Sequence, residues 1–393
     1  MKRMNTGLFQ RCLAFLSALF LLVAGCGGAN STAPPSTPLA TCAPSSKSEF
    51  AYVLTGYAVS MFTVDSCKGT FTAMTPVSVA TGYAFPQNVN AEQMVVDPSG
   101  RFAYVANLVS NVSDEATISM YTIDPGTGVL TATAPATVPT GFYPQGIAID
   151  PSGRFVYTAN SDDNSVSMFT INQTTGILTP TTPATVPAGS SPGFVTIDPS
   201  GRFAYVSDQD DDTISMYNIN PTTGVLTPMT PATVPSGPDP FGVAIDPSGK
   251  FAYVPAPYST DNRVSEYTID LVTGVLTQTQ AVALAGQSPT AVAIDPTSKF
   301  AYVTNRQANT VSMYTIDSAT GNLTLNATVA HPAGSIATGN EPFRINFDPG
   351  GKFLYVTNEG SAASVYTVNS DGTLTSLGTT GVGGVSTAIA VLH

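Results

Sequence analysis

The chain of 393 residues contains no tryptophan, only two histidines and four cysteines, and just 10% charged residues. Soluble domains carry about 25% charged residues, so this surface must be polar mainly through uncharged side chains. Lysine and arginine number 14 against 26 aspartates and glutamates, a net charge of −12. That balance argues against nucleic acid as a partner. Hydrophobic residues make up 42%, which argues against a disordered chain.

Several catalytic motifs are also missing. The sequence has no nucleophile elbow in a strand-to-helix setting, no Gly-x-x-x-x-Gly-Lys-Ser/Thr phosphate loop and no zinc-binding His-Glu-x-x-His motif. After residue 26, no segment shows a convincing helical period. The sequence therefore indicates architecture more clearly than activity.

The first 25 residues have the layout of a secretory signal. A basic start precedes an apolar run over residues 13–24, which is shorter than the roughly 20 residues that cross a bilayer. The run ends in small residues directly before Cys26, an order that resembles the bacterial lipoprotein box. This resemblance implies that residues 1–25 are removed and that a lipid on Cys26 anchors the protein outside the cytoplasm, at the outer membrane or cell surface. An ordinary signal peptide with a chance cysteine is the alternative.

Residues 26–48 hold the predicted lipidated cysteine and a stretch rich in Gly, Ser, Thr, Ala and Pro, which is typical of a flexible tether. Cys12 would be lost with the signal. Cys42 and Cys67 then remain in an oxidising compartment, where a disulfide is the expected state. The sequence predicts that these two cysteines pair.

The remainder of the chain is a repeat. Asp-Pro pairs recur every 48 to 53 residues, beginning at Asp97, Asp150, Asp198, Asp246, Asp295 and Asp348. A phenylalanine that opens a short apolar run follows each pair, and Phe50 opens a seventh such run without the pair. This period indicates seven structural repeats.

Each repeat holds four short runs rich in β-branched and aromatic residues, bounded by turn residues, which is the strand signature. In the third repeat the runs cover residues 146–149, 155–158, 165–171 and 177–179. Four antiparallel strands per repeat predict a propeller blade. We therefore expect an all-β, seven-bladed propeller over residues 49–393. The first repeat lacks its first run and residues 388–391 supply a matching one, so the C-terminal strand should pair into blade one and close the ring.

One string of the repeat identifies a family. Residues 97–107 read Asp-Pro-Ser-Gly-Arg-Phe-Ala-Tyr-Val-Ala-Asn, and residues 302–305 and 355–358 both spell Tyr-Val-Thr-Asn. These strings resemble the lactonase-type seven-bladed propellers, also described as Tyr-Val-Thr-Asn repeat proteins, over nearly all of residues 50–393. The resemblance implies the propeller fold. Members include proteins similar to 6-phosphogluconolactonase, muconate-cyclising enzymes, and surface or adhesion proteins.

Candidate chemistry lies where the repeat is broken near the expected central mouth. Arg344 stands at the start of the first strand of the seventh repeat, Glu341 lies three residues earlier, and His331 lies in the longer link before it. These three residues could act as oxyanion partner, orienting acid and base toward a lactone carbonyl. The alternative is an Arg–Glu ion pair that fixes the link, with His331 in solvent.

A second candidate is a metal site. Asp208, Asp210 and Asp212 alternate in the second-to-third loop of the fourth repeat, and alternating carboxylates can gather round calcium. The spacing lacks the glycine and distal glutamate of an EF-hand, and a general preference for polar turns is the alternative. No other cofactor is expected.

Two functions fit these features. The lipid anchor, the tether, the low charge and the near-identical repeats favour a cell-envelope scaffold that binds a protein or carbohydrate ligand. The alternative is a lactone hydrolase. Since phosphate recognition usually needs clustered arginine or lysine, its substrate would be an unphosphorylated sugar lactone.

Overall fold

The computed structural model describes residues 49–81, 89–109, 116–258, 262–359, 362–384 and 386–392. The predicted signal peptide, the lipidation site Cys26, the tether and Cys42 lie outside these residues, so anchoring and localisation stay predictions. Within the described residues, no helix is long and apolar enough to span a bilayer.

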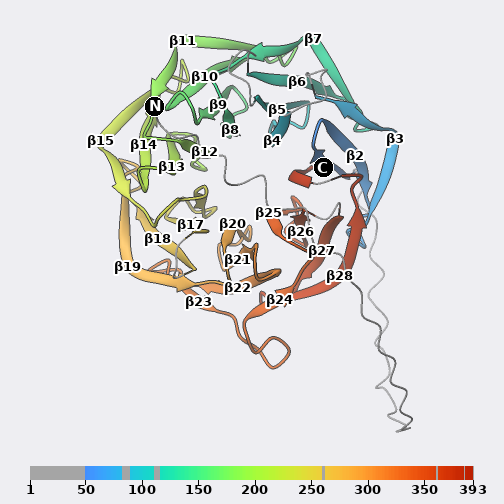
Figure 1. Cartoon of the computed structure of the whole chain (residues 1–393), viewed down its shortest axis with the longest axis vertical. Coiled ribbons are helices and arrows are strands. Elements are labelled where there is room, and N and C mark those ends of the chain that lie inside the picture. The colour runs from blue at the N-terminus through green and yellow to red at the C-terminus, as the bar shows by residue number, and fades with distance from the viewer. Residues whose placement is uncertain are drawn as a thin grey trace, which may run out of the picture. The chain divides into compact units, whose positions relative to one another are not determined.

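Seven antiparallel sheets are arranged around a central axis (Figure 1), as the repeat predicts. From the inner to the outer strand, blade one consists of β29 (Ser386–Leu392), β1 (Glu49–Thr55), β2 (Ala58–Val64) and β3 (Phe71–Ala80). Blade two consists of β4 (Val89–Val96), β5 (Phe102–Val109), β6 (Thr117–Ile123) and β7 (Leu130–Pro139). Blade three consists of β8 (Pro144–Ile149), β9 (Phe155–Asn160), β10 (Ser165–Ile171) and β11 (Leu178–Pro187).

Blades four to seven continue in the same order around the ring. Blade four consists of β12 (Pro192–Ile197), β13 (Phe203–Asp208), β14 (Thr213–Ile219) and β15 (Leu226–Pro235), and blade five of β16 (Ala244–Ile245), β17 (Phe251–Pro255), β18 (Arg263–Ile269) and β19 (Leu276–Leu284). Blade six consists of β20 (Pro289–Ile294), β21 (Phe300–Asn305), β22 (Thr310–Ile316) and β23 (Leu323–Leu325) with β24 (Ser335–Ala337). Blade seven consists of β25 (Pro342–Phe347), β26 (Phe353–Asn358), β27 (Ala362–Val368) and β28 (Leu374–Gly381).

The C-terminal strand closes the ring. β29 pairs antiparallel with β1, with Phe50 opposite Leu392 and Val53 opposite Ile389. It therefore becomes the innermost strand of blade one, which confirms the prediction. Ala388 and Ile389 are buried, so the strand contributes to the core as well as to the sheet.

Tyrosines on the second strands join each blade to the next. Six hydroxyl groups donate to the carbonyl oxygen of a glycine in the third-to-fourth turn of the following blade. The pairs are Tyr52–Gly128, Tyr104–Gly176, Tyr157–Gly224, Tyr205–Gly274, Tyr253–Gly321 and Tyr302–Gly372, at 2.6–2.9 Å. Glycine is required here because Gly176 has φ 74°, and a Cβ on it would lie 2.3 Å from Cδ1 of Phe102.

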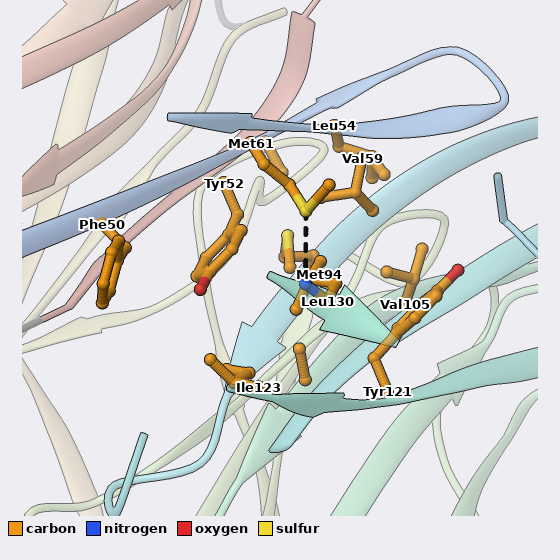
Figure 2. Close-up of a cluster of buried hydrophobic side chains, with 12 residues drawn as sticks. Phe50, Tyr52, Leu54, Val59, Met61, Met94, Val105, Tyr121, Ile123 and Leu130 are labelled. Carbon is orange, nitrogen blue, oxygen red and sulfur yellow. Dashed lines mark hydrogen bonds between the residues drawn. The ribbon is translucent and has the colours of Figure 1, made fainter. Parts of the chain in front are cut away.

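Methionines on the third strands make a second interblade contact. Each sulfur accepts a hydrogen bond from a leucine N–H at the start of the next blade's outer strand. These pairs are Met61–Leu130, Met120–Leu178, Met168–Leu226 and Met216–Leu276, at 3.2–3.4 Å. Figure 2 shows the first pair within its apolar cluster. The repeated methionines therefore pack blades together.

Blade five departs from this pattern, since Glu266 stands where five of the other six blades have methionine. Its Oε1 accepts the N–H of Leu323 in blade six at 3.2 Å. The side chain is buried, and this desolvation raises the pKa of Glu266 to about 7.

The Asp-Pro turns occupy one side of the ring, called here the bottom. In the turn of blade three, Oδ1 of Asp150 accepts the N–H groups of Arg154 and Phe155, both at 2.7 Å. The Arg154 guanidinium lies 5.0 Å from the ring centre of Phe155. The repeated basic residues are therefore turn residues, as expected. The interblade links and second-to-third loops occupy the opposite side, the top.

Candidate functional site

A cavity of about 270 Å³ lies at the centre of the ring among the inner strands. Most of the residues that line it are apolar, but polar atoms supply the larger part of its surface, and polar side chains enter from β4, β12 and β25 as Gln93, Thr196, Asn346 and Arg344. A concave pocket into which a few polar groups converge is the usual form of a small-molecule site. The cavity is therefore the candidate site.

Arg344 supplies the cavity with a cation. Its backbone N–H donates to Oγ1 of Thr357 at 3.0 Å, which fixes the start of β25. Its guanidinium lies 4.1, 4.9 and 5.3 Å from the ring centres of Phe194, Phe343 and Phe241. Faces of aromatic rings attract cations, so the three rings hold a positive group in an apolar setting, where it acts strongly on nearby charge.

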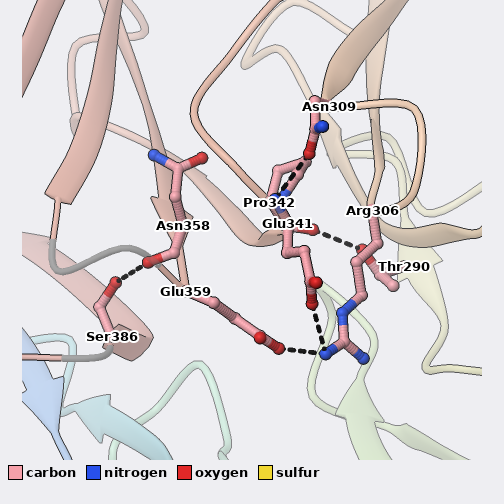
Figure 3. Close-up of polar contacts among 8 residues, drawn as sticks. All are labelled: Thr290, Arg306, Asn309, Glu341, Pro342, Asn358, Glu359 and Ser386. Atoms are coloured by element: carbon pink, nitrogen blue, oxygen red, sulfur yellow. Dashed lines mark hydrogen bonds and ion pairs between the residues drawn. The ribbon is translucent and has the colours of Figure 1, made fainter. Parts of the chain in front are cut away.

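A second arginine lies at the top of the same region. Arg306, in the loop after β21, forms an ion pair of 3.0 Å with Glu341 and also contacts the carboxylate of Glu359. Figure 3 shows the two carboxylates converging on this guanidinium. Arg306 lies 5.7 Å from the ring centre of Phe343, the ring that Arg344 also contacts. The cluster of Arg306, Glu341 and Glu359 therefore adjoins the Arg344 site.

The carboxylates of this region have perturbed pKa values. Burial raises the pKa of Glu359, the neighbouring Glu341 raises it further, and Arg306 opposes both effects. Burial also raises the pKa of Asp239 to about 6, and the charges of Asp210 and Asp212 add to that shift. Carboxylic acids that titrate closer to neutral pH are suited to proton transfer.

The structure brings only part of the predicted trio together. Arg344 lines the cavity as predicted, whereas Glu341 forms an ion pair with Arg306. His331 lies between β23 and β24, in a segment that projects from the outer edge of the ring (Figure 1). Its imidazole acts electrostatically on Asp371 in the β27–β28 turn at the bottom. His331 is therefore placed away from the cavity, which corrects the expectation that it lies near the central mouth.

Sequence reasoning missed Arg306 and Glu359. Each directly follows the repeated asparagine that ends a second strand, Asn305 and Asn358. Charged residues at this same position in two consecutive repeats were the available signal.

The calcium interpretation is not supported. Asp208 is buried at the end of β13, where it accepts hydrogen bonds from Ser215 and Thr213, and its pKa rises to about 6 through burial. It stands where four other blades have asparagine. Oδ1 of Asp212 accepts the N–H of Asp239 at 2.8 Å. Over the described ranges, no group of three His, Cys, Asp or Glu residues could hold a metal ion.

Cys67, in the turn between β2 and β3, is disulfide-bonded. Its predicted partner, Cys42, lies outside the described residues, so the pairing stays a prediction.

Comparison with known proteins decides the family. A family model described as "Lactonase, 7-bladed beta-propeller" matches residues 42–191, 184–241, 228–335 and 285–391. The chain belongs to the lactonase seven-bladed β-propeller family. No curated protein matches its sequence.

Solved structures of lactonase-type propellers share the fold. A candidate 6-phosphogluconolactonase of Bacteroides fragilis superposes with a TM-score of 0.72 at 22% identity, covering 91% of this chain and 100% of that one. The periplasmic gluconolactonase of Pseudomonas aeruginosa gives a TM-score of 0.69 at 20% identity, covering 88% and 99%. At these identities the likeness shows the fold, and any activity must be argued from the site.

Proposed function

We propose that this lactonase-family propeller hydrolyses a sugar lactone in its central cavity. The observation that carries the proposal is Arg344, a cation enclosed by three aromatic rings in the cavity and adjoining a pair of carboxylates. The family match and the lactonase names of similar structures favour this hypothesis over the interaction scaffold.

The chemistry requires two groups. Water attacks the carbonyl carbon, negative charge develops on the carbonyl oxygen, and the ring C–O bond then breaks as the ring oxygen takes up a proton. Arg344 donates hydrogen bonds to the developing oxyanion, and the apolar rings around it strengthen that interaction.

Glu359 accepts the proton of the attacking water and returns it to the ring oxygen. Its raised pKa makes it a better base than an exposed glutamate. Arg306 and Glu341 act as positioning residues, because their contacts with Glu359 fix where the carboxylate points.

The test measures hydrolysis of glucono-1,5-lactone by the full chain against the uncatalysed rate. Arg344→Gln is expected to lower kcat/KM about 100-fold or more, because the loss of one oxyanion donor has that size of effect. Glu359→Gln is expected to lower kcat and to remove the acidic limb of the pH–rate profile, which a structural role would not do.

His331→Asn is the matched control. It also changes a polar side chain beside blade seven, but at the outer edge of the ring, and it should leave kcat/KM within about twofold. A wild-type rate no greater than the uncatalysed rate, or an Arg344→Gln enzyme with full activity, would contradict the proposal.

A further inference from the structure

We propose that carboxylates on the top of blades four and five select uncharged lactones and reject phosphorylated ones. This inference rests on the proposed function and adds to it the charge class of the substrate and the residues that set it. The residues are Asp210, Asp212 and Asp239, called here the rim aspartates. They belong neither to the cavity lining nor to the Arg306 cluster.

The rim aspartates form one group. The N–H of Asp239 donates to Oδ1 of Asp212 at 2.8 Å, which joins the link before β16 to the loop after β13. Asp210 and Asp212 both act electrostatically on the partly buried carboxylate of Asp239. Three carboxylates from two adjacent blades therefore combine their fields at one place.

The same link connects this group to the cavity. Phe241 follows Asp239 by two residues, lines the cavity, and packs on Phe343 with ring centres 5.6 Å apart. Arg344 contacts the rings of both phenylalanines. A substrate whose carbonyl is bound by Arg344 would thus lie close to the rim aspartates.

Cations are distributed unequally between the two sides of the ring, although both sides carry carboxylates. The repeated cations are at the bottom, where the guanidinium groups of Arg101, Arg154 and Arg202 lie on phenylalanine rings. Within the described top loops, links and strand ends, the cations are Arg263, Arg306 and Arg344, and Arg306 is shared by two glutamates. The described carboxylates on that side are Asp162, Asp163, Asp208, Asp210, Asp211, Asp212, Asp239, Glu341 and Glu359.

This excess of negative charge acts on a phosphate dianion and leaves a neutral lactone unaffected. Clefts lined by charge of one sign repel ligands of that sign. The Debye length is about 8 Å at physiological ionic strength, so three charges beside the mouth of the cavity should still lower the affinity for a phosphorylated lactone several-fold.

The experiment compares glucono-1,5-lactone with its 6-phosphate, using the wild-type chain and the triple variant Asp210→Asn/Asp212→Asn/Asp239→Asn. Asparagine at 212 keeps the acceptor for the N–H of residue 239. We expect the ratio of kcat/KM for the phosphorylated over the neutral lactone to rise about fivefold at 0.15 M salt and more at 0.01 M. Activity on the neutral lactone should stay within twofold.

The matched control removes three charges from the other side of the ring. Asp124→Asn/Asp270→Asn/Asp317→Asn changes aspartates in bottom turns of three blades, where Asn172 and Asn220 already occupy the equivalent positions. Its net charge equals that of the rim variant. An equal rise in the ratio for both triple variants would show a net-charge effect only and would overturn the inference, as would an unchanged ratio in the rim variant.

Measuring the binding of the two product acids distinguishes a failure of this inference from a failure of the proposed function. If the wild type hydrolyses neither lactone, the proposed function fails, and calorimetric titration with gluconate and 6-phosphogluconate replaces the rate ratio. The inference is supported if the wild type binds gluconate more tightly than 6-phosphogluconate and this preference is smaller in the rim variant but unchanged in the control. Equal affinities for the two acids, or binding of neither, overturns it.

Discussion

The joints between blades one to five and the mouth of the central cavity are built on opposite principles. At the joints the same residues recur, so that a tyrosine hydroxyl meets a glycine carbonyl and a methionine sulfur meets a leucine N–H from blade to blade. At the mouth the repeat is broken by charged residues, Arg306, Glu341, Arg344 and Glu359, each found in one blade or link.

The difference separates the residues that stabilise the ring from those to which we assign its proposed chemistry. A contact that recurs from joint to joint satisfies the same buried groups each time, so the main effect of a change there is lost packing. A charge that occurs once and near the axis, such as that of Arg344, instead lines the cavity between the inner strands. The repeat therefore explains the fold, and its exceptions point to the site.

The joint between blades seven and one sharpens this comparison, because it departs from the repeat without chemistry. Val365 takes the place of the methionine, and Phe71 packs on Tyr355 with ring centres 5.0 Å apart. Here β29 joins the sheet of blade one and packs against blade seven, where Ile389 lies in the shared core cluster. Closure should therefore depend on this strand.

The largest expected effect follows from removing β29. A chain ending at Gly384 exposes the inner edge of β1 and opens the core around Ile389, so we expect loss of the cooperative melt rather than a shifted midpoint. Circular dichroism and calorimetry would measure it. A chain ending at Leu392 keeps every paired residue and should melt like the wild type. Cooperative melting of the shorter chain at an unchanged temperature would contradict a ring closed by β29.

The next effect concerns a regular joint. Gly176→Ala places a Cβ on Phe102 and forces an L-residue to φ 74°, so we expect a loss of about 3 kcal/mol in the free energy of unfolding. Gly56 has φ 61°, but a Cβ added to it would meet no atom within 4 Å, and Gly56→Ala should cost only about 1 kcal/mol. Denaturant titration of both variants measures the difference. Equal losses would show that backbone conformation, rather than interblade contact, sets the glycine requirement.

The sequence predicts the fold almost completely because blade strands and turns are local. The period, the Asp-Pro turns and the unmatched last run were sufficient for blade number, strand order and closure. The interblade bonds were not predictable, because they join residues about 70 positions apart, as in Tyr104 and Gly176.

The site was predictable only in part, for the same reason. Arg344 was found because it breaks the repeat at a position whose place is fixed by its strand. The expected position of His331 is wrong because the link that carries it leaves the ring between β23 and β24. The other repeats have no equivalent segment, so the repeat does not predict the path of this link. The alternating aspartates predict a loop at Asp208, whereas its alignment with Asn160 and Asn305 marks a buried strand end.

The smallest effect tests whether a regular joint can be restored between blades five and six. Glu266→Met returns the repeated residue, whose sulfur can accept the N–H of Leu323 as in four other joints. The pKa of Glu266 is raised to about 7, so the folded protein holds a proton that the unfolded chain releases near pH 4.5. Wild-type stability should therefore fall as the pH rises from about 4.5 to about 7 and then level off.

The methionine variant should lack the part of that fall that Glu266 contributes and should exceed the wild type by roughly 2 kcal/mol above pH 7, with little difference at pH 4. Glu266→Gln is the matched control, because it removes the titration while keeping the shape and the acceptor for Leu323. Urea titrations at pH 4, 6 and 8 measure both variants. If the glutamine variant keeps the pH dependence of the wild type, a group other than Glu266 is responsible for it. A charged glutamate would then be no less stable at this joint than methionine is at the other joints.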